Sequence, residues 1–159
     1  MDHERSLAEP AFPDDDGLLD PTLAPALGSG EELLAVFGAA RVFVPVVAVL
    51  VGDQDLAAIE GDKNAEMAAV FMTSSQGRKA LLTFGSVETM TQWNPRARPV
   101  PVYGRDAARA ALAEDATAIL FDLGQPHFRV IETSDVQHLA AEDVLVALPT
   151  GGTAWVTSS

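Results

Sequence analysis

Residues 41–51, RVFVPVVAVLV, hold the longest apolar run of the chain and limit its fold more than any other feature. From Val42 to Val51 the run is uncharged, rich in β-branched residues and interrupted only by Pro45. It is too short to cross a membrane as a helix and is typical of a strand buried on both faces. Because proline has no backbone N–H to donate, the sequence predicts that this strand lies at a sheet edge or contains a bulge.

The rest of the chain alternates between helical and strand patterns. Apolar spacing and serine caps indicate helices, whereas β-branched runs between turn residues indicate strands. The predicted helices are 31–40, 86–93, 105–114 and 134–142, and the predicted strands are 41–51, 66–73, 78–84, 99–103, 117–122 and 127–131. We therefore expect an α/β (mixed α+β) fold, with a single domain and a central mixed sheet of about five to six short strands against which the helices pack.

The two ends of the chain differ in composition from its middle. Residues 1–30 hold seven acidic residues, one Arg and four prolines, which indicates an acidic, flexible N-terminal leader. Residues 31–148 form the predicted α/β domain, and residues 149–159 form a C-terminal tail. The first residues lack the apolar core of a signal peptide, and the chain has no cysteine. A cytoplasmic protein without disulfides is the expectation.

The formal net charge of −13 limits the classes of partner. Nucleic-acid binding needs cations that neutralise phosphates, so we expect no nucleic-acid partner. The short apolar runs predict no membrane partner either. The expected partner is an unknown protein or a second copy of the chain, and no cofactor is expected. The basic residues are unevenly spread, because six of the ten lie between residues 78 and 109.

The polar segment Thr73–Lys79, TSSQGRK, combines hydroxyls, a glycine and two cations, and it could cradle a phosphate or form a hairpin turn. A phosphate loop needs a helix after the glycine, with a hydroxyl directly after the lysine. Here Ala80–Phe84 follows, which is a strand pattern. The sequence favours a hairpin turn with Gly77 near the position of positive φ.

The sequence contains no clear catalytic or metal-binding constellation. A nucleophilic Ser75 would need a positioned base, and an arrangement with Asp122 and His127 is conceivable without being favoured. The acidic residues Asp53, Asp55, Glu60 and Asp62 lack the spacing of a calcium loop. We therefore expect a surface loop there, and no enzymatic activity in the protein.

The most distinctive surface candidate lies between residues 93 and 109. Two arginines next to a tryptophan and two further arginines four residues apart on a predicted helix could contact an anion or an acidic peptide. The alternative is that the tryptophan anchors a helix in the core and that the arginines are solvated. The candidate ligand or partner contacts are Trp93, Arg96, Arg98, Arg105 and Arg109.

Several segments resemble the SseB amino-terminal domain family, also labelled enhanced serine sensitivity protein B or type III secretion SseB-like. The strongest is Leu81–Ser86, LLTFGS, followed by an acidic helix that ends in Trp93. The other matching segments are Arg41–Val47, Val100–Leu112, Ala118–Asp122 and Phe128–Val130. The resemblance covers roughly residues 31–140 and implies a bacterial α/β module without an established catalytic activity.

Two positions depart from the pattern of that family. Gly85 stands where a threonine is usual, and Phe121-Asp122-Leu123 stands where Ile-Asn-Pro is usual. Ligand contacts that family members make through these positions do not carry over to this chain.

Three hypotheses for the function follow from the sequence. The first is a non-enzymatic module that binds a protein partner or itself, because short strands leave sheet edges available. The second is a small-molecule or anion sensor that uses the basic segment 93–109. The third, which nothing specific favours, is a hydrolase built on Ser75 and a histidine.

Overall fold

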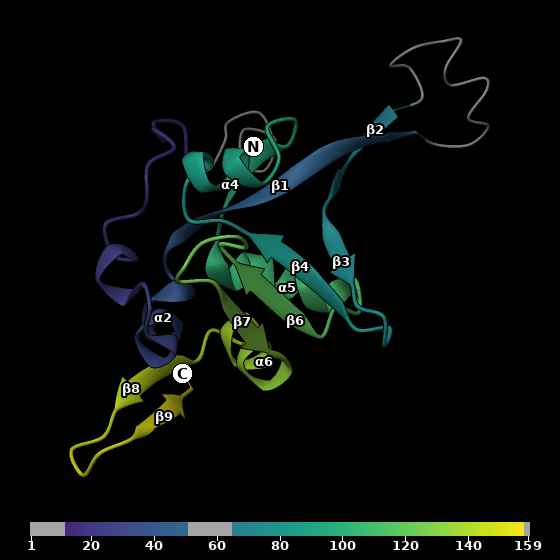
Figure 1. The fold of residues 1–159 in the computed structure, drawn as a ribbon. Helices are drawn as coiled ribbons and strands as arrows, with labels where there is room; N and C mark the ends of the chain where they lie inside the picture. The colour runs from purple at the N-terminus through teal and green to yellow at the C-terminus, as the bar shows by residue number, and fades with distance from the viewer. Residues whose placement is uncertain (1–11, 51–64, 158–159) are drawn as a thin grey trace, which may run out of the picture.

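The computed structural model describes residues 12–50 and 65–157, and its strands form three sheets (Figure 1). The first sheet has the order β2-β1-β5 with antiparallel pairs, and the second has the order β3-β4-β6-β7 with a parallel pair β4–β6. Strands β8 and β9 form a separate antiparallel ribbon. The strands are β1 (Arg41–Leu50), β2 (Ala65–Ala69), β3 (Phe71–Thr73), β4 (Lys79–Thr83), β5 (Arg98–Tyr103), β6 (Ala118–Phe121), β7 (Arg129–Glu132), β8 (Val144–Ala147) and β9 (Thr153–Val156).

Two of the helices begin after serines whose side chains cap them. Ser29 Oγ accepts a hydrogen bond from the Glu32 N–H at 3.3 Å, and Ser86 Oγ accepts one from the Thr89 N–H at 3.2 Å. The helices are η1 (Ala24–Ala26), α2 (Gly30–Phe37), α4 (Val87–Trp93), α5 (Gly104–Ala113) and α6 (Thr133–Ala140). Within the described part of the chain, no helix is both long and apolar enough to cross a membrane.

The mixed α/β class and the single domain predicted from the sequence are confirmed, but the strands are divided among three sheets instead of one. The division arises at Val70, where the single strand predicted over 66–73 changes sheets. Val70 N–H donates to Pro45 O at 3.1 Å in the first sheet, and Val70 O accepts from Leu82 N–H at 3.2 Å in the second. One residue therefore joins β2 to β3 and bonds to both sheets.

The prediction that Pro45 marks a sheet edge or a bulge is wrong, because β1 is the central strand of its sheet. Pro45 lies opposite Pro99 in the β1–β5 pair. The Pro45 carbonyl points the other way, toward Val70. Since the N and C=O of a strand residue face the same side, the missing N–H falls where β2 gives way to β3. The proline therefore removes no hydrogen bond from the β1–β5 ladder.

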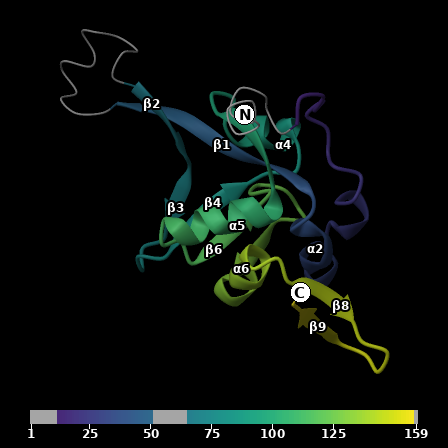
Figure 2. The same cartoon turned by 180° about the vertical axis from the view of Figure 1, so that it is seen from behind.

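The four-stranded sheet packs one face against the main core. Along the row Phe71, Leu81, Ile119 and Ile131, directly paired residues of the four strands point into the main core. Helices α5 and α6 cover this face, as the view from behind shows (Figure 2). Helix α5 lies close to the sheet because the residues it buries there are small, including three alanines. The opposite face of the sheet carries no helix over its lower half (Figure 1).

The folded unit is longer at both ends than the predicted domain 31–148. Leu23 and Ala26, in the predicted leader, are buried in the main core. At the other end, β9 lies in the predicted tail and pairs with β8. The leader and tail boundaries therefore do not match the packed structure. The first eleven residues of the predicted leader lie outside the described residues.

Candidate functional site

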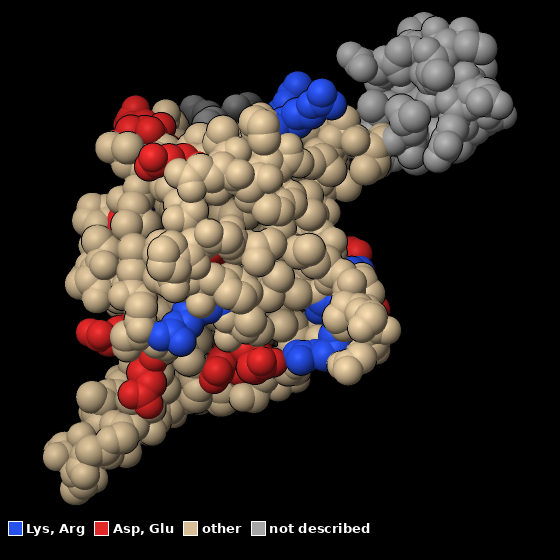
Figure 3. Space-filling model, viewed as in Figure 1, with Lys and Arg blue, Asp and Glu red and all other residues tan. Residues whose placement is uncertain are grey.

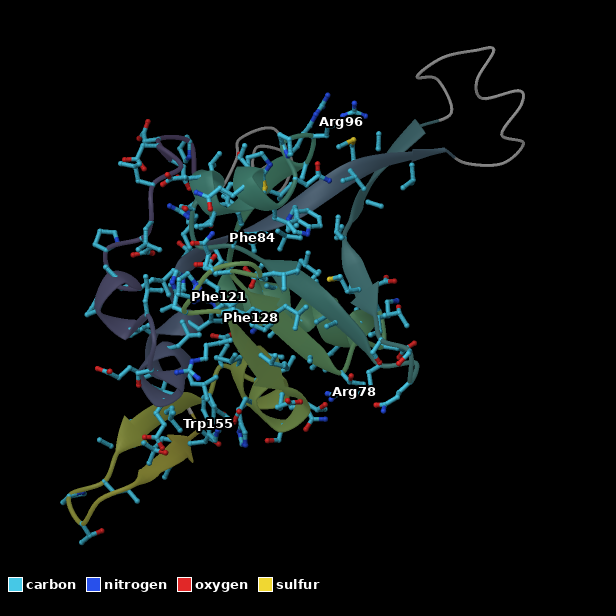
Figure 4. All side chains as sticks on the ribbon, viewed as in Figure 1. Arg78, Phe84, Arg96, Phe121, Phe128 and Trp155 are labelled. Carbon is cyan, nitrogen blue, oxygen red and sulfur yellow. The ribbon has the colours of Figure 1, made fainter. Side chains whose placement is uncertain are left out.

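The structure separates the arginines of the predicted basic site into two groups. Arg98 begins β5 and Arg105 follows its end, so the length of the strand, about 17 Å at 3.3 Å per residue, lies between them. Arg96 lies in the turn after α4 and points outward at the top of Figure 4. Arg105 instead lines a cavity of 290 Å³ beside α2. The segment 93–109 thus does not form one anion site.

The second pair of arginines is engaged within the molecule. The Arg105 guanidinium stacks on the Tyr103 ring at 4.4 Å. Arg109 pairs with Asp106 at 2.8 Å and with Glu142, and its hydrogen bond to Glu142 raises the pKa of the guanidinium. Both side chains have partners within the molecule, although Arg109 is exposed, as are Arg96 and Arg98.

Trp93 belongs to the core rather than to the surface. Its ring is partly buried and packs on Phe84, with a centroid distance of 5.6 Å, against the small cluster of buried residues under α4. The interpretation of Trp93 as the anchor of its helix is confirmed.

The polar segment Thr73–Lys79 is a hairpin turn, as the sequence favoured. Strands β3 and β4 pair antiparallel on either side of it, and Gly77 has a φ of 85°. The Ser74 hydroxyl accepts hydrogen bonds from the N–H groups of Gln76 and Arg78 at 3.2 and 3.1 Å. The Ser74 side chain therefore stabilises the turn itself.

Ser75 and His127 lie at opposite ends of the parallel pair β4–β6. Ser75 is in the turn that precedes β4, whereas His127 follows the C-terminal end of β6. The conceivable triad is therefore not assembled. Two of its three members are in contact, because His127 Nε2 lies 2.6 Å from Asp122 Oδ2. No serine or threonine hydroxyl of the described residues bonds to the His127 ring.

Asp122 is the centre of a buried hydrogen-bond network at the end of β6. Its side chain is 2% exposed. In addition to His127, its Oδ1 accepts hydrogen bonds from Gly85 N–H at 2.8 Å and Thr89 Oγ1 at 3.2 Å. Asp122 has a φ of 56°, a conformation that aspartate and asparagine tolerate better than other side chains. One side chain thus ties the end of β4, the start of α4 and the loop after β6 together.

Replacing Asp122 by alanine is expected to lower the free energy of unfolding by about 2–3 kcal/mol, because a buried N–H of Gly85 loses its acceptor and alanine resists positive φ. Asp122→Asn keeps an oxygen for Gly85 and tolerates the backbone, so about 1 kcal/mol is expected. Urea unfolding followed by circular dichroism measures both. Equal losses for the two variants would contradict the role given to the Gly85 contact.

A cavity of 590 Å³ lies beside this network, between α4 and the N-terminal segment 16–27. Its lining mixes hydroxyls and carboxylates with the leucines of that segment. The lining residues are Asp16, Gly17, Leu18, Leu19, Leu27, Ser86, Val87, Glu88, Thr89, Asp122 and His127.

Gly85 is the position that lets the N-terminal segment lie here. A Cβ at Gly85 would approach Leu19 Cδ1 to 2.7 Å and Phe121 Cζ to 3.2 Å. Any larger residue would therefore displace Leu19 or the Phe121 ring.

Arg41 fastens the N-terminal segment to β1 and to the end of β4. Its side chain is 9% exposed, and its Nε lies 2.7 Å from Asp15 Oδ2. The guanidinium also donates to Gly85 O at 2.9 Å and to Leu18 O. Its carbon lies 4.1 Å from the centroid of the Phe43 ring. Every part of the planar group has a partner, so Arg41 acts as a clamp.

Asp20 adds a second fastening through the backbone of the same residue. Burial raises the pKa of the Asp20 carboxyl, but hydrogen bonds from Arg41 N–H and from the Thr22 N–H and hydroxyl lower it more, so the pKa lies below 3.8. The stabilisation from Asp20 is therefore complete above this ordinary value and is lost as the pH falls through the lower pKa of the folded state.

A second hollow lies on the open face of the four-stranded sheet. It has a volume of 440 Å³. Met72 and Val130 on this face are 44% and 42% exposed. We call it the sheet groove, and its lining residues are Met72, Thr73, Ser74, Gln76, Arg78, Lys79, Ala80, Thr117, Ala118, Leu120, Leu123 and Val130. In the space-filling view, cations and acids lie along the lower rim of this face, and the surface above them is largely free of charged side chains (Figure 3).

One cation at the start of β4 lies at the rim of the sheet groove. Arg78 Nη2 pairs with Glu132 Oε1 at 2.9 Å, and both side chains are more than half exposed. Arg78 is seen at the lower right of the sheet in Figure 4. The ammonium group of the next residue, Lys79, lies on the face that α5 covers, where Nζ is 4.6 Å from the Phe71 ring centroid and donates to Glu114 O at 2.9 Å. The groove therefore combines an apolar floor with one cation at its margin.

The described residues contain no cluster of three or more His, Asp or Glu side chains suited to a metal ion. The acidic loop that includes Asp53, Asp55, Glu60 and Asp62 lies outside the described residues.

Comparison with known proteins gives one match. The family model described as the SseB protein N-terminal domain matches residues 24–138. No curated protein and no solved structure matches the chain significantly. The matched range covers the two larger sheets and the helices as far as the middle of α6, and it ends before the β8–β9 ribbon.

Proposed function

Because the chain belongs to the SseB N-terminal domain family, we propose that it is a non-enzymatic binding module that takes up a segment of another protein in the sheet groove. The observation that carries the proposal is the apolar face of the four-stranded sheet that lines the groove. Leu120 and Val130 are paired neighbours on this face, and Met72, Ala80 and Ala118 form the adjacent row out to the edge strand β3. A contiguous exposed apolar surface is typical of a protein interaction site.

The charge at the margin indicates the chemistry of the partner segment. Apolar side chains suit the floor of the groove, and a carboxylate suits Arg78. Because the Arg78–Glu132 pair is exposed, it contributes at most about 1 kcal/mol. Arg78 can therefore exchange Glu132 for a partner carboxylate at little cost. The partner segment that fits best is apolar with an acidic end.

The proposal predicts that peptides of this composition bind the intact protein. Selection from a random peptide library on immobilised protein should enrich apolar sequences that contain Asp or Glu. Val130→Asp places a charge in the groove. It should raise the dissociation constant of an enriched peptide by about tenfold or more, measured by calorimetry.

Val100→Asp is the matched control. Val100 is a valine of similar exposure, at 38%, on the edge strand β5 of the other sheet. This variant should bind the peptide as the unmodified protein does. No enrichment, or an equal loss of binding in the two variants, would contradict the sheet groove as the binding site.

A further inference from the structure

The β8–β9 ribbon extends away from the body of the molecule at the lower left of Figure 1. From Val144 to the last residue the sequence has no charged side chain, in a chain whose formal net charge is −13. The projecting part is accordingly uniform in Figure 3, without acids or bases. This is the longest uncharged stretch of the chain, and it follows the part that the family model matches.

The inner face of the ribbon is anchored to the domain. The Trp155 ring stacks on the His138 ring of α6 with a centroid distance of 4.7 Å and an angle of 9°. Trp155 Nε1 also donates to Asp135 Oδ1 at 3.3 Å, and Leu145 opposite Trp155 is buried. Because one face is fixed in this way, the ribbon presents its other face and its edges in a defined orientation.

The outer face is apolar and exposed. Val144 and Val156 lie directly opposite each other and are 50% and 49% exposed. The next outward pair along the ribbon is Val146 with Ala154. Four apolar side chains thus line this face, and no residue of the ribbon is charged. Such a surface is unusual for a solvated two-stranded ribbon.

The outer edge of β9 has unused backbone groups. Leu148 N–H donates to Gly152 O at 2.9 Å, so this opposed pair is hydrogen-bonded. By the alternation of an antiparallel ladder, Ala154 bonds to β8, whereas the N–H and C=O of Thr153 and Trp155 point away from β8. No described strand lies along that side of β9 in either view (Figures 1 and 2).

Apart from its shortness, this edge lacks the usual protection against pairing. Exposed edges of native sheets are kept short or are guarded by charged side chains, prolines or bulges. The segment Thr153–Val156, TAWV, has none of the three. The edge is therefore open to another strand.

We propose that β9 pairs antiparallel with β9 of a second copy of this chain, which makes a four-stranded ribbon across a two-fold axis. A two-fold interface must be complementary to itself, and an uncharged apolar strand meets that requirement. Two copies that each carry a formal net charge of −13 repel each other over most of their surfaces. An uncharged projection is therefore where they can approach. The small contact area predicts weak, concentration-dependent association.

The outward backbone groups set the register. Thr153 of one copy lies opposite Trp155 of the other, so that each such pair exchanges two hydrogen bonds. Ala154 then lies on the two-fold axis, opposite Ala154 of the second copy. The two Cβ atoms are about 4.5–5.5 Å apart in this arrangement, which lies within reach of a disulfide after slight adjustment.

Cross-linking tests the register directly, because the chain has no cysteine. Under mild oxidation, the full chain with Ala154→Cys should form a disulfide-linked dimer in good yield. Val100→Cys, an exposed position on β5, should remain largely monomeric under the same conditions. Equal, low yields for both variants would overturn the proposed register.

Sedimentation velocity over a range of concentrations tests the association itself. Ala154→Lys brings two like charges together on the axis and should raise the dissociation constant by about tenfold or more. Thr153→Pro removes an outward N–H without touching the β8–β9 ladder and should also favour the monomer. Circular dichroism confirms that the variants are folded.

Val146→Lys separates edge pairing from stacking of the outer faces. Val146 shares the outer face with Ala154 but lies on β8, one strand away from the axis. We therefore expect the Val146→Lys variant to dimerise like the unmodified chain. A monomer at every concentration, or dissociation by Val146→Lys but not by Ala154→Lys, would overturn it.

Discussion

Replacing Gly104 by alanine is expected to lower the free energy of unfolding by at least about 3 kcal/mol, and the variant should fail to fold at elevated temperature. A Cβ at this position would lie 1.9 Å from Phe37 O and 2.6 Å from Phe37 Cδ1. Gly104 begins α5 where it meets the end of α2, and its N–H donates to Ala40 O at 3.0 Å. Because the first clash is with a backbone oxygen, no change of side-chain rotamer relieves it.

Gly30→Ala is the matched control for this prediction. Gly30 is likewise the first residue of a helix, but a Cβ there would meet no atom within 4 Å. This variant should be as stable as the unmodified chain or gain up to about 1 kcal/mol, since alanine restricts the unfolded chain. Urea unfolding of the two variants measures the contrast. Similar midpoints for both would show that α2 and α5 can separate more easily than the structure indicates.

The second large effect is expected from Arg41→Ala, which should cost about 3–5 kcal/mol because it leaves a largely buried Asp15 carboxylate without its partner. The change also removes the donors for Gly85 O and Leu18 O. Arg41→Lys keeps the charge but not the planar fork, so most of the loss should remain. Hydrogen exchange should show faster exchange at Gly17 and its neighbours before the sheets open.

Two comparisons separate the clamp from a general effect of removing an arginine. Arg129 is exposed and also donates to a carbonyl of the N-terminal segment, that of Gly28. Its replacement by alanine should cost less than about 1 kcal/mol. Asp15→Asn combined with Arg41→Ala should be less harmful than the sum of the single changes. Strict additivity would contradict a direct coupling of Arg41 and Asp15.

Local sequence signals were sufficient where one residue determines the outcome. The serine before α4 and the glycine of the β3–β4 turn act through their own backbone and nearest neighbours, so both features could be predicted. The burial of Trp93 was named as an alternative, because its spacing in the helix is apolar. The break at Val70 could not be predicted, since the residues on either side are apolar and suit one continuous strand.

The candidate sites depend on long-range contacts that carry little local signal. Arg41 is charged and begins a strand, so its sequence context indicates an exposed flank, whereas a segment more than twenty residues earlier buries it. Asp122 and His127 are only five residues apart, but their contact depends on the positive φ of Asp122. The N-terminal segment is short and acidic and has few leucines, which is typical of a flexible leader. That it covers a cavity is evident only from the structure. The family pattern gives a clue here, because a glycine replaces the usual threonine at position 85 and leaves space for Leu19.

The sheet change at Val70 has a consequence for the order in which a growing chain can fold. When residues up to Thr83 have been made, only the neighbouring pairs β1–β2 and β3–β4 can form. The other pairs, β1–β5 and β4–β6, wait for residues 98–121. Both sheets, which meet at Val70, therefore lack a strand until these residues have been made, and we expect both to close late. Such distant pairing slows folding, so early intermediates of this chain should expose two incomplete sheets at once.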